Sequence, residues 1–578
     1  MHTFDLRRFT PAVLGLAAVL LAPSAGAQNT LANTAKANAI PKAGHGILAP
    51  TFQMGSAGTD EKTLLNPKVL GNPGKFRPIY QGRALSDAEY QQWKQSLIGT
   101  SLGGRPEPTS DGITPFVNAG TVKYGTLGID EIAAEGPAGY GYAWEPPDTN
   151  FAVGPNSAVQ PANSGVRRYT KTGTYTLSTY DTQALNSFMF EPATENGWFT
   201  VGFDPDSYYD AAGGHFVVTD ADFPWFDANG GYHMTVDIAV SVNSDIRNGV
   251  GVYQVDMGSL FAGSTYSGQA FIDYPHVGFD NGNIIITFNI FDNYYGYYMG
   301  AGVFILNKAQ AYALSSAYYN DWGYNVNSNT GYLYGTLMPP RVIAEGTAGS
   351  YLLFDYPNDN IWLYNLQGTA GSSPTLGGYY FADSVPNMAP PPPATDPGGV
   401  FIDTLDGRLQ HSPTQNGNTM LAVSTVNLGG LPTVQMYEFN AYNATSIDTH
   451  YIYAGTTTDD FNPAIAGNAN NSWAVVWDST GLGRTTKTQY DLSVAVTSFQ
   501  PEYAGTNPWS AANVKGKLVK KSIYTDNMGR NGDYSAVQVD PSDSRRLWFS
   551  NELVSSDTTF GAGNEWVNWI GNLLFTTP

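Results

Sequence analysis

Seven stretches of the sequence share one pattern, in which a polar residue or proline precedes a short β-prone run, a turn and a second, more apolar run. Six of the seven begin with an aspartate: Asp148, Asp204, Asp273, Asp406, Asp460 and Asp533. Equivalent residues of repeated units occupy equivalent places, so these carboxylates are expected to form a ring. Grouped carboxylates repel one another, which raises some of their pKa values or requires a cation, and hard oxygen ligands suit calcium or magnesium.

Two other roles fit the same aspartates. Each carboxylate could accept hydrogen bonds from backbone N–H groups at the start of its strand, which requires neither an ion nor a substrate. Two of them could instead act as the acid and the base or nucleophile of glycosidic cleavage. The sequence does not give the distance between carboxylates, so all three roles stay open.

A second candidate set surrounds the stretch DYPHV. Tyr274 and His276 lie within it, and Arg341 lies in the repeat that starts at Pro339. A histidine, a tyrosine and an arginine are the usual groups for proton abstraction in polysaccharide lyases, so these three could supply that chemistry. The alternative is that His276 is a hydrogen-bonded residue that fills the interior.

Two runs rich in tyrosine, DNYYGYYMG from Asp292 and SAYYNDWGYNVN from Ser316, are predicted to be loops. Aromatic rings beside glycine and asparagine offer faces on which sugar rings stack, with hydroxyl groups that orient them. Packing on a neighbouring sheet is the alternative. The candidate ligand-binding residues are Tyr294, Tyr295, Tyr297, Tyr298, Tyr318, Tyr319 and Trp322.

The bulk composition excludes several classes of protein. The sequence has no H-E-x-x-H or P-loop motif, and its one G-x-S-x-G match, at Gly99 to Gly103, follows a predicted helix and not a strand. Serine hydrolase, zinc protease and nucleotide chemistry are therefore without support. A formal net charge of -21 argues against nucleic acid and anionic membranes as partners. Because there is no cysteine, stability must come from burial in a large core.

The first 143 residues are predicted to form a signal and a segment that packs on the main domain. Residues 1–27 carry Arg7 and Arg8, a short apolar run and Ala-Gly-Ala, which predicts a secretory signal and an extracellular or periplasmic protein without a membrane span. Residues 28–143 are predicted to wrap on the main domain, with one helix opened by the capping box at Ser86 and ending near Leu97.

Residues 144–578 are predicted to form an all-β domain. The repeats are spaced by 54 to 73 residues and contain three or four strands each, which is typical of a β-propeller and indicates seven blades. Six or eight blades, or two packed β-sandwiches, are the alternatives. The final run WVNWIGNLL supplies a last strand, whose partner is expected in a segment before Trp144.

Three phrases carry a resemblance to a known group: PPDTNFAVGPN at Pro146, DYPHVGFD at Asp273 and GDYSAVQVDPSD at Gly532. With these, residues 144 to 575 resemble the secreted bacterial β-propeller proteins called sialidase-like or BNR-like. The resemblance implies the propeller fold. It does not imply sialidase chemistry, because the chain has no S-x-D-x-G-x-x-W Asp-box and no Arg-Ile-Pro stretch.

The sequence thus predicts a secreted, monomeric propeller that binds an extracellular ligand, most plausibly a glycan, at an acidic channel lined by aromatic loops. Calcium is a possible cofactor. The alternative is a glycan-cleaving enzyme, either a glycoside hydrolase that uses channel carboxylates or a polysaccharide lyase that uses His276. A peptidase is a weaker third option.

Overall fold

The computed structural model describes residues 46–48, 51–53, 87–98, 105, 120–131 and 133–575. The gaps in the last span are 135–145, 164, 174–175, 190–201, 227–230, 258–269, 293–297, 325–335, 357–359, 381–388, 443–446, 483–488, 500–512, 523, 525–529 and 555–565. The chain divides into two units, Met1–Thr34 and Ala35–Pro578. The first, which holds the predicted signal, lies outside the described residues, and everything below concerns the second.

Nearly all described elements are β-strands, as the composition indicated. The helical elements are short: α1 (Asp87–Ser96), α4 (Leu185–Met189), α6 (Lys308–Tyr312) and a 3-10 turn, η2 (Ile246–Asn248). The helix predicted after Ser86 is confirmed as α1.

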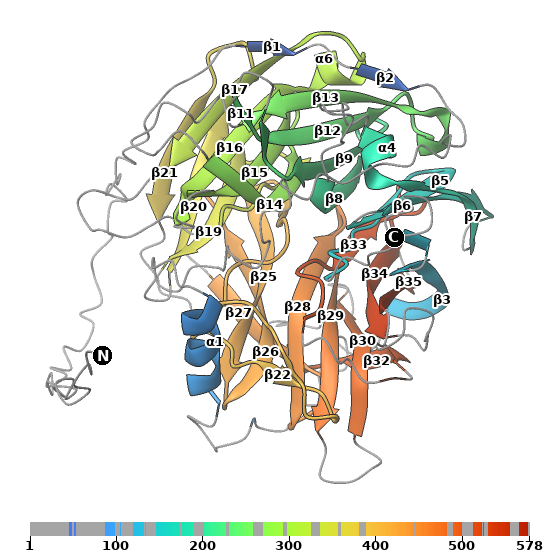
Figure 1. The fold of residues 1–578 in the computed structure, drawn as a ribbon, viewed down its shortest axis with the longest axis vertical. Helices are drawn as coiled ribbons and strands as arrows, with labels where there is room; N and C mark the ends of the chain where they lie inside the picture. Colours follow the sequence, from blue (N-terminus) through green and yellow to red (C-terminus); the bar gives the residue numbers. More distant parts are fainter. Residues whose placement is uncertain are drawn as a thin grey trace, which may run out of the picture. The chain divides into compact units, whose positions relative to one another are not determined.

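Strands pair mainly with their neighbours in sequence, which produces antiparallel sheets (Figure 1). The first sheet holds β4 (Ala152–Val153), β5 (Ser157–Ala162), β6 (Gly165–Thr172) and β7 (Thr176–Ala184). The second holds β8 (Gly202–Asp210), β9 (His215–Asp222), β12 (Thr235–Ser241), β13 (Val250–Asp256) and β2 (Thr51–Gln53).

The largest sheet has eleven strands. One part holds β14 (Ala270–Phe279), β15 (Asn283–Asp292), β16 (Tyr298–Asn307), β17 (Ala317–Tyr324) and β1 (Gly46–Leu48). The other part holds β24 (Thr414–Asn416), β25 (Thr419–Leu428), β26 (Leu431–Asn440), β27 (Ile447–Tyr453) and β31 (Asn513–Lys515). The short strand β18 (Arg341–Ala344) joins the two parts, because it pairs in parallel with both β14 and β24.

Three further sheets complete the main architecture. They hold β19 (Ser350–Tyr356), β20 (Asn360–Gln367) and β21 (Thr375–Tyr380); β28 (Thr458–Gly467), β29 (Trp473–Leu482), β30 (Gln489–Phe499) and β32 (Lys517–Lys521); and β33 (Ala536–Val539), β34 (Arg546–Val554), β35 (Trp566–Phe575) and β3 (Gly120–Asp130). Two small pairs lie apart: β10 (Trp225–Phe226) with β11 (Tyr232–His233), and β22 (Ala394–Thr395) with β23 (Phe401–Ile402).

The first strands of the repeats form a closed circuit. They contact one another in the order β4, β8, β14, β18, β24, β28, β33 and again β4. Sheets arranged around such a circuit define a β-propeller, so the predicted all-β propeller fold is confirmed.

The predicted count of seven separate blades is wrong. The described strands form five sheets of four or more strands, plus the three-stranded sheet β19–β21. The physical reason is β18, whose parallel hydrogen bonds fuse two of the expected units into one sheet. The repeat pattern predicted strand pairs within repeats but not the hydrogen bonds between repeats, which here replace the pair expected after Pro339.

The prediction that the last strand of the chain pairs with a segment before Trp144, and so closes the ring of sheets, is confirmed. Strand β3 pairs antiparallel with β35, from Gly120 opposite Phe575 to Asp130 opposite Val567. Two other segments add edge strands to neighbouring sheets: β1 pairs with β17 and β2 with β13, while β31 pairs with β27 and β32 with β30. These strands cover edges that would otherwise expose unpaired backbone groups.

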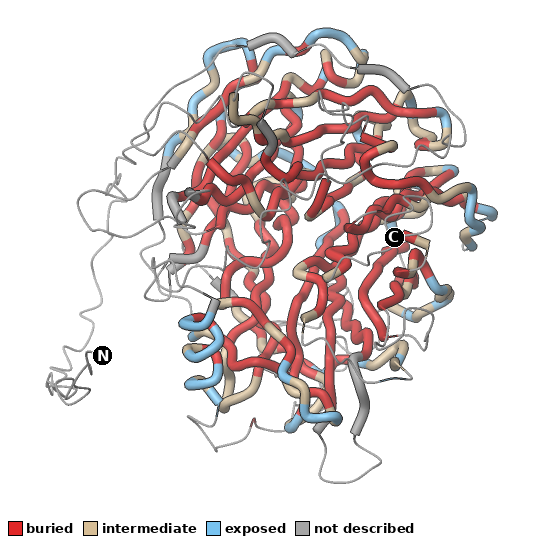
Figure 2. The backbone as a smooth tube through the Cα atoms, viewed as in Figure 1, coloured by how far each residue is buried: buried red, intermediate tan, exposed pale blue. Residues whose placement is uncertain are grey.

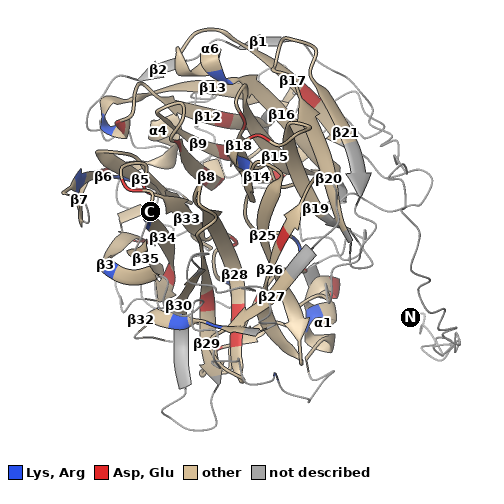
Figure 3. Ribbon diagram, turned by 180° about the vertical axis from the view of Figure 1, so that it is seen from behind, with Lys and Arg blue, Asp and Glu red and all other residues tan. Residues whose placement is uncertain are grey.

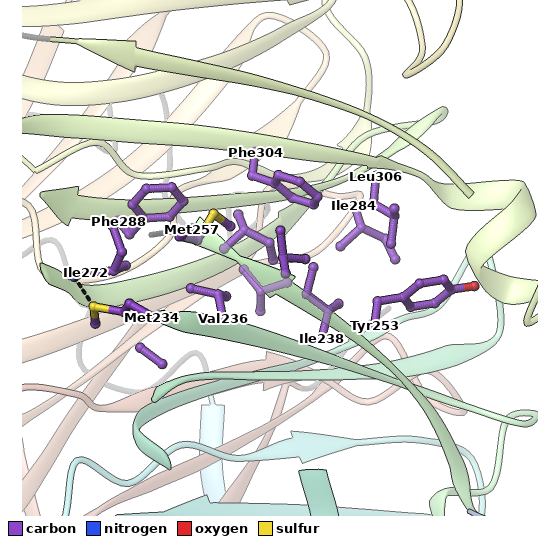
Figure 4. Close-up of a cluster of buried hydrophobic side chains, with 14 of the residues drawn as sticks. Met234, Val236, Ile238, Tyr253, Met257, Ile272, Ile284, Phe288, Phe304 and Leu306 are labelled. Atoms are coloured by element: carbon purple, nitrogen blue, oxygen red, sulfur yellow. Dashed lines mark hydrogen bonds between the residues drawn. The ribbon is translucent and has the colours of Figure 1, made fainter. Parts of the chain in front are cut away.

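The core lies between the sheets. Figure 2 shows that the strands are mostly buried and that exposed residues gather on α1, β3 and β7. The largest cluster lies between the second sheet and β14–β16, where Met234, Val236, Ile272 and Phe288 are fully buried (Figure 4). Burying a side chain of this size contributes about 1.5–3 kcal/mol, so each interface between sheets contributes substantially to stability.

Candidate functional site

The same backbone irregularity recurs near the start of several innermost strands. The register of the first two strands of a repeat shifts between Phe203 and Asp206, between Asp273 and His276, and between Phe461 and Ala464. Non-glycine residues with a positive φ angle stand at the same places: Asp148 (43°), Asp204 (51°), Tyr274 (57°) and Asn462 (48°). Such bulges turn side chains away from the regular strand direction, and strained backbone of this kind gathers at functional sites.

Four of the six predicted aspartates come together at this end of the propeller. We call Asp148, Asp204, Asp273 and Asp533 the carboxylate cluster. The backbone N–H of Asp533 donates to Asp148 Oδ1 at 2.6 Å, and the side chain of Asp204 hydrogen-bonds to those of Asp148 and Asp273. Asp148 is buried, while the other three are half-buried and therefore reach solvent.

The cluster holds protons at unusually high pH. Burial, followed by the negative charge of Asp533, raises the pKa of Asp148 to about 7, and burial raises the pKa of Asp273 to about 6. Burial and the charges of Asp148 and Asp273 raise the pKa of Asp204 well above its usual range. A hydrogen bond between two carboxyl groups requires a proton, and Asp204 is the group that retains it. Near pH 7 the cluster therefore contains both a carboxylic acid and carboxylates.

Backbone contacts explain part of this arrangement. The N–H of Tyr274 donates to Asp204 Oδ2 at 3.2 Å, and Asp148 also accepts from Asn163 Nδ2 at 2.9 Å. The alternative that each aspartate accepts hydrogen bonds from backbone N–H groups thus describes Asp148 and Asp204 as well. These hydrogen bonds hold the side chains of Asp148 and Asp204 in positions where the two carboxyl groups contact each other.

The remaining two predicted aspartates lie elsewhere. Asp406 pairs with Arg408, with 2.7 Å between Oδ1 and Nε, and that guanidinium lies over the ring of Tyr274. Asp460 is fully buried within its own sheet, where it accepts from Trp477 Nε1 at 2.8 Å and pairs with Arg105. Each of these two carboxylates forms an ion pair with an arginine, as Asp533 of the cluster also does with Arg530 at 2.7 Å.

The proposed lyase residues converge, but inside the protein. Tyr274 and His276 pack with ring centroids 4.4 Å apart, and Arg341 Nη2 donates to Asp206 Oδ1 at 3.1 Å. Nδ1 of His276 lies 3.7 Å from Oδ2 of the same Asp206. Tyr274, His276 and Arg341 are each at most 4% exposed, so a polymeric substrate cannot reach them directly.

Asp206 and His411 complete this internal network, and sequence reasoning missed both. Burial alone would raise the pKa of Asp206, but the Arg341 guanidinium, His276 and the N–H of Val277 together outweigh burial and hold that pKa below its usual value. Burial lowers the pKa of His411, whose Nε2 lies 2.8 Å from Arg341 Nη1. The only sequence signal was the second aspartate of the phrase DPDS.

The tyrosine runs differ from the predicted loops. Tyr294, Tyr295 and Tyr297 lie outside the described residues, as does the side chain of Tyr298, whose backbone begins β16. The second run is an outer strand, β17, in which alternate side chains face the core. Trp322 is 6% exposed in a core cluster and Tyr319 stacks on Phe304, so the prediction that both bind ligand from a loop is not supported. Tyr318 alone of the three is exposed, at 42%.

A different acidic group has the geometry of a cation site. Among the described residues, Asp220, Asp222 and Asp237 are buried on the paired strands β9 and β12, with ligand oxygens within 4.8 Å of one another. Figure 3 marks acidic residues on β12, as well as on β28 and β29. The sequence signal was the alternation in TDAD followed by an aspartate in the facing strand.

A surface hollow of about 510 Å³ lies at the opposite end of the strands. It is lined by hairpin turns, including Asp280, Glu345 and Gly368. Asp280 accepts from Gly282 N, Asn283 N and Ser350 Oγ, so its carboxylate is already occupied by hydrogen bonds within the protein. The carboxylate cluster is therefore the better candidate site, because its carboxyl groups share protons and remain accessible.

In the described part of the chain, no helix is long and apolar enough to cross a membrane.

Neither a protein-family model nor a curated protein matches the chain. Among solved structures, it is similar to a Trypanosoma rangeli sialidase, at 10% identity and a TM-score of 0.32, over 66% of this chain and 57% of that one. It is also similar to a phage phi92 endosialidase (8%, 0.33, 63% and 66%) and to a Penicillium chrysogenum α-L-arabinanase complexed with arabinobiose (10%, 0.34, 78% and 98%). The sialidase-like resemblance read from the sequence thus recurs among these structures, and at such identities it concerns the fold alone.

Proposed function

We propose that this protein is an exported β-propeller that binds an extracellular glycan at the carboxylate cluster. The observation that carries the proposal is the convergence of Asp148, Asp204, Asp273 and Asp533 at the end where the innermost strands begin, with three of the four half-buried. Ionised carboxylates accept hydrogen bonds from sugar hydroxyls, and a protonated one donates, so the cluster offers both functions to a polyhydroxylated ligand.

A glycoside hydrolase is the second candidate, and a specific observation favours it. Asp204, whose pKa lies well above its usual range, hydrogen-bonds to both Asp148 and Asp273, and burial raises the pKa values of these two to about 7 and about 6. Glycosidic cleavage uses one carboxylic acid to protonate the leaving oxygen and one carboxylate as base or nucleophile. The lyase alternative gains no such support, since His276 is buried beneath the cluster.

The purified protein should be offered a panel of neutral and acidic polysaccharides. Retention is measured by pull-down, and cleavage by new reducing ends and by unsaturated-uronate absorbance. We expect retention of at least one polysaccharide, lost in Asp204→Asn and in Asp273→Asn. The matched control is Glu345→Gln, an exposed carboxylate of the hollow at the other end of the strands.

The outcomes separate the two candidates. Retention without new ends supports binding alone, while new reducing ends lost in the two aspartate variants establish the hydrolase. No retention of any polysaccharide, or retention that Glu345→Gln abolishes and Asp204→Asn does not, would overturn the proposal.

A further inference from the structure

The lysines of the described part of the chain fall into two groups. Lys94, Lys171 and Lys308 are at most 9% exposed, and each forms an ion pair with an aspartate. The other lysines are exposed or half-buried and lie on outer strands of three sheets. We call them the basic rim: Lys123 on β3, Lys515 on β31, and Lys517, Lys520 and Lys521 on β32. Figure 3 marks basic residues on β3 and β32.

The segment from β31 to β32 connects the outer edges of two sheets. β31 pairs with β27 and β32 with β30, and Gly516 lies between the two strands. A Cβ at Gly516 would lie 2.1 Å from the ring of Trp477, so glycine allows the backbone to pass this close. On either side of Gly516 in sequence, Lys515 and Lys517 are exposed. The segment thus carries exposed positive charge from one sheet to the next.

Lys520 extends the rim to the sheet that contains β3. Its Nζ lies 4.7 Å from the centroid of the Trp569 ring on β35. That ring lies against β3, because a Cβ at Gly125 would be 2.1 Å from it, and Lys123 lies in the same stretch of β3. A backbone N–H of β3 also donates to a side chain of β30, the neighbour of β32. Strands far apart in sequence therefore bring their lysines to one rim.

The positive charge of the rim is not balanced by carboxylates. Within the described residues, no ion pair is formed by Lys123, Lys515, Lys517 or Lys520, in contrast to the three buried lysines. Like charges at one place add their fields, so the rim attracts an anionic partner, and salt weakens that attraction.

Protection of strand edges does not explain the rim. Lysines on edge strands discourage pairing with other molecules. However, the outer strands β1, β2, β7 and β21 of the other sheets carry no lysine. Since these edges do without lysine, its concentration on β31 and β32 requires another explanation.

The arrangement of the rim indicates the kind of partner. An ammonium group binds carboxylate or sulfate as a point charge with three donors. Residues two apart on a strand are separated by about 6–7 Å, so the rim suits a polymer with charges repeated along its length. A wide anionic membrane would also meet the rest of an acidic protein, and no exposed large hydrophobic side chain lies on the described parts of β31 or β32 to enter it. A flexible polymer can contact the rim alone.

We propose that the basic rim is a second binding surface, which holds a flexible anionic polysaccharide at the outer edge of the propeller. It is separate from the carboxylate cluster, which lies where the innermost strands begin, and it has the opposite charge. The inference therefore does not depend on the proposed function.

The experiment measures binding of the purified protein to immobilised polygalacturonate and dextran sulfate at low salt by biolayer interferometry. Fully methyl-esterified polygalacturonate is the uncharged control ligand. We expect binding of the anionic polymers only. Replacing Lys123, Lys515, Lys517 and Lys520 together by Gln should lower the affinity about tenfold or more, and Lys517→Gln alone about threefold.

The matched control is Arg545→Gln, which also removes one positive charge. The Arg545 side chain is 39% exposed, lies at a hairpin turn and pairs with Asp543 at 2.9 Å. This variant should leave the affinity for both polymers unchanged.

The outcomes separate this inference from the proposed function. Unchanged affinity in the folded four-lysine variant, equal binding of the esterified polymer, or no binding of either anionic polymer would overturn the rim. Loss of binding in Asp204→Asn, but not in the four-lysine variant, would also overturn the rim and leave the proposed function standing. Loss in the four-lysine variant, with no retention in the polysaccharide panel that depends on Asp204, would support the rim and overturn the proposed function. Binding of phosphatidylglycerol vesicles without binding of the polymers would overturn the polysaccharide as the partner.

Discussion

Aspartates stand at both ends of the innermost strands, and their surroundings differ. At the hairpin turns, Asp540 accepts from Ser542 N at 2.8 Å, Lys171 Nζ at 2.6 Å and Trp548 Nε1 at 2.9 Å, so each of its oxygens has a partner of opposite polarity. At the other end, Asp204 is bonded to two other carboxyl groups. The turn aspartates stabilise the fold. In the cluster, burial and the neighbouring carboxylates raise the pKa values of the aspartates, and three of the four side chains stay partly exposed.

The largest effect should come from the turn end. Asp540→Ala leaves the buried ammonium of Lys171 without its partner, since the two side chains are 1% and 2% exposed. Removing one member of a buried pair costs about 3–5 kcal/mol. Urea unfolding at pH 7 should show this loss, and replacing Lys171 by Met in the same variant should recover part of it. A loss below about 1 kcal/mol would show that the turn aspartates are not structural in this sense.

The cluster should behave in the opposite way, with a smaller effect whose sign depends on pH. Because the folded state raises the pKa of Asp148 to about 7, the folded protein binds a proton more tightly than the unfolded chain. Stability from this group is therefore complete below the unfolded pKa near 4 and declines as pH rises towards 7. Asp148→Asn should remove that decline. The free energy of unfolding of the variant, relative to that of the wild type, should therefore rise by on the order of 2 kcal/mol from pH 5 to pH 8.

The comparison is made by urea unfolding at both pH values. The neighbouring groups that also titrate or carry charge, Asp204, Asp533 and Arg530, are unchanged in the variant. Parallel pH profiles for the variant and wild type would show that Asp148 is ionised normally in the folded protein.

Calcium gives the smallest expected effect. A divalent cation competes with the shared protons, so it should bind the ionised cluster at pH 8 better than at pH 5. We expect millimolar calcium to raise the melting temperature by a few degrees at pH 8, and EDTA to reverse the increase. Asp273→Asn should abolish it. An equal increase in that variant would place the cation at another group, such as Asp220, Asp222 and Asp237.

The sequence predicted features that depend on local pattern. The capping box at Ser86 preceded a helix, and each aspartate that opened a repeat preceded a strand pair. The strand that follows Pro339, β18, pairs instead with strands of other repeats. The terminal run WVNWIGNLL found its partner before Trp144. These succeeded because turn residues and two-residue alternation act over a few positions.

Features that depend on tertiary contacts were not predicted. Asp460 shares the repeat position of Asp204, yet folding buries it within its own sheet beside Arg105, which is distant in sequence. The burial of Trp322 follows from the packing of both faces of β17 at Asn320 to Trp322, which depends on neighbouring sheets distant in sequence. The fusion of two units through β18 depends on backbone hydrogen bonds that leave no trace in composition.

The pairing of β3 with β35 sets the order in which the molecule can be completed. Glu131 and Trp566, which form a hydrogen bond at the end of this pair, are 435 residues apart in sequence. A chain that emerges from its N-terminal end presents β3 long before its partner exists, and long-range closures of this kind are slow. During that interval the ring has an open seam between the last sheet and the first. Asp148 meets Asp533 at the same seam, so we expect the carboxylate cluster to be assembled late in folding and ligand binding to report completed closure.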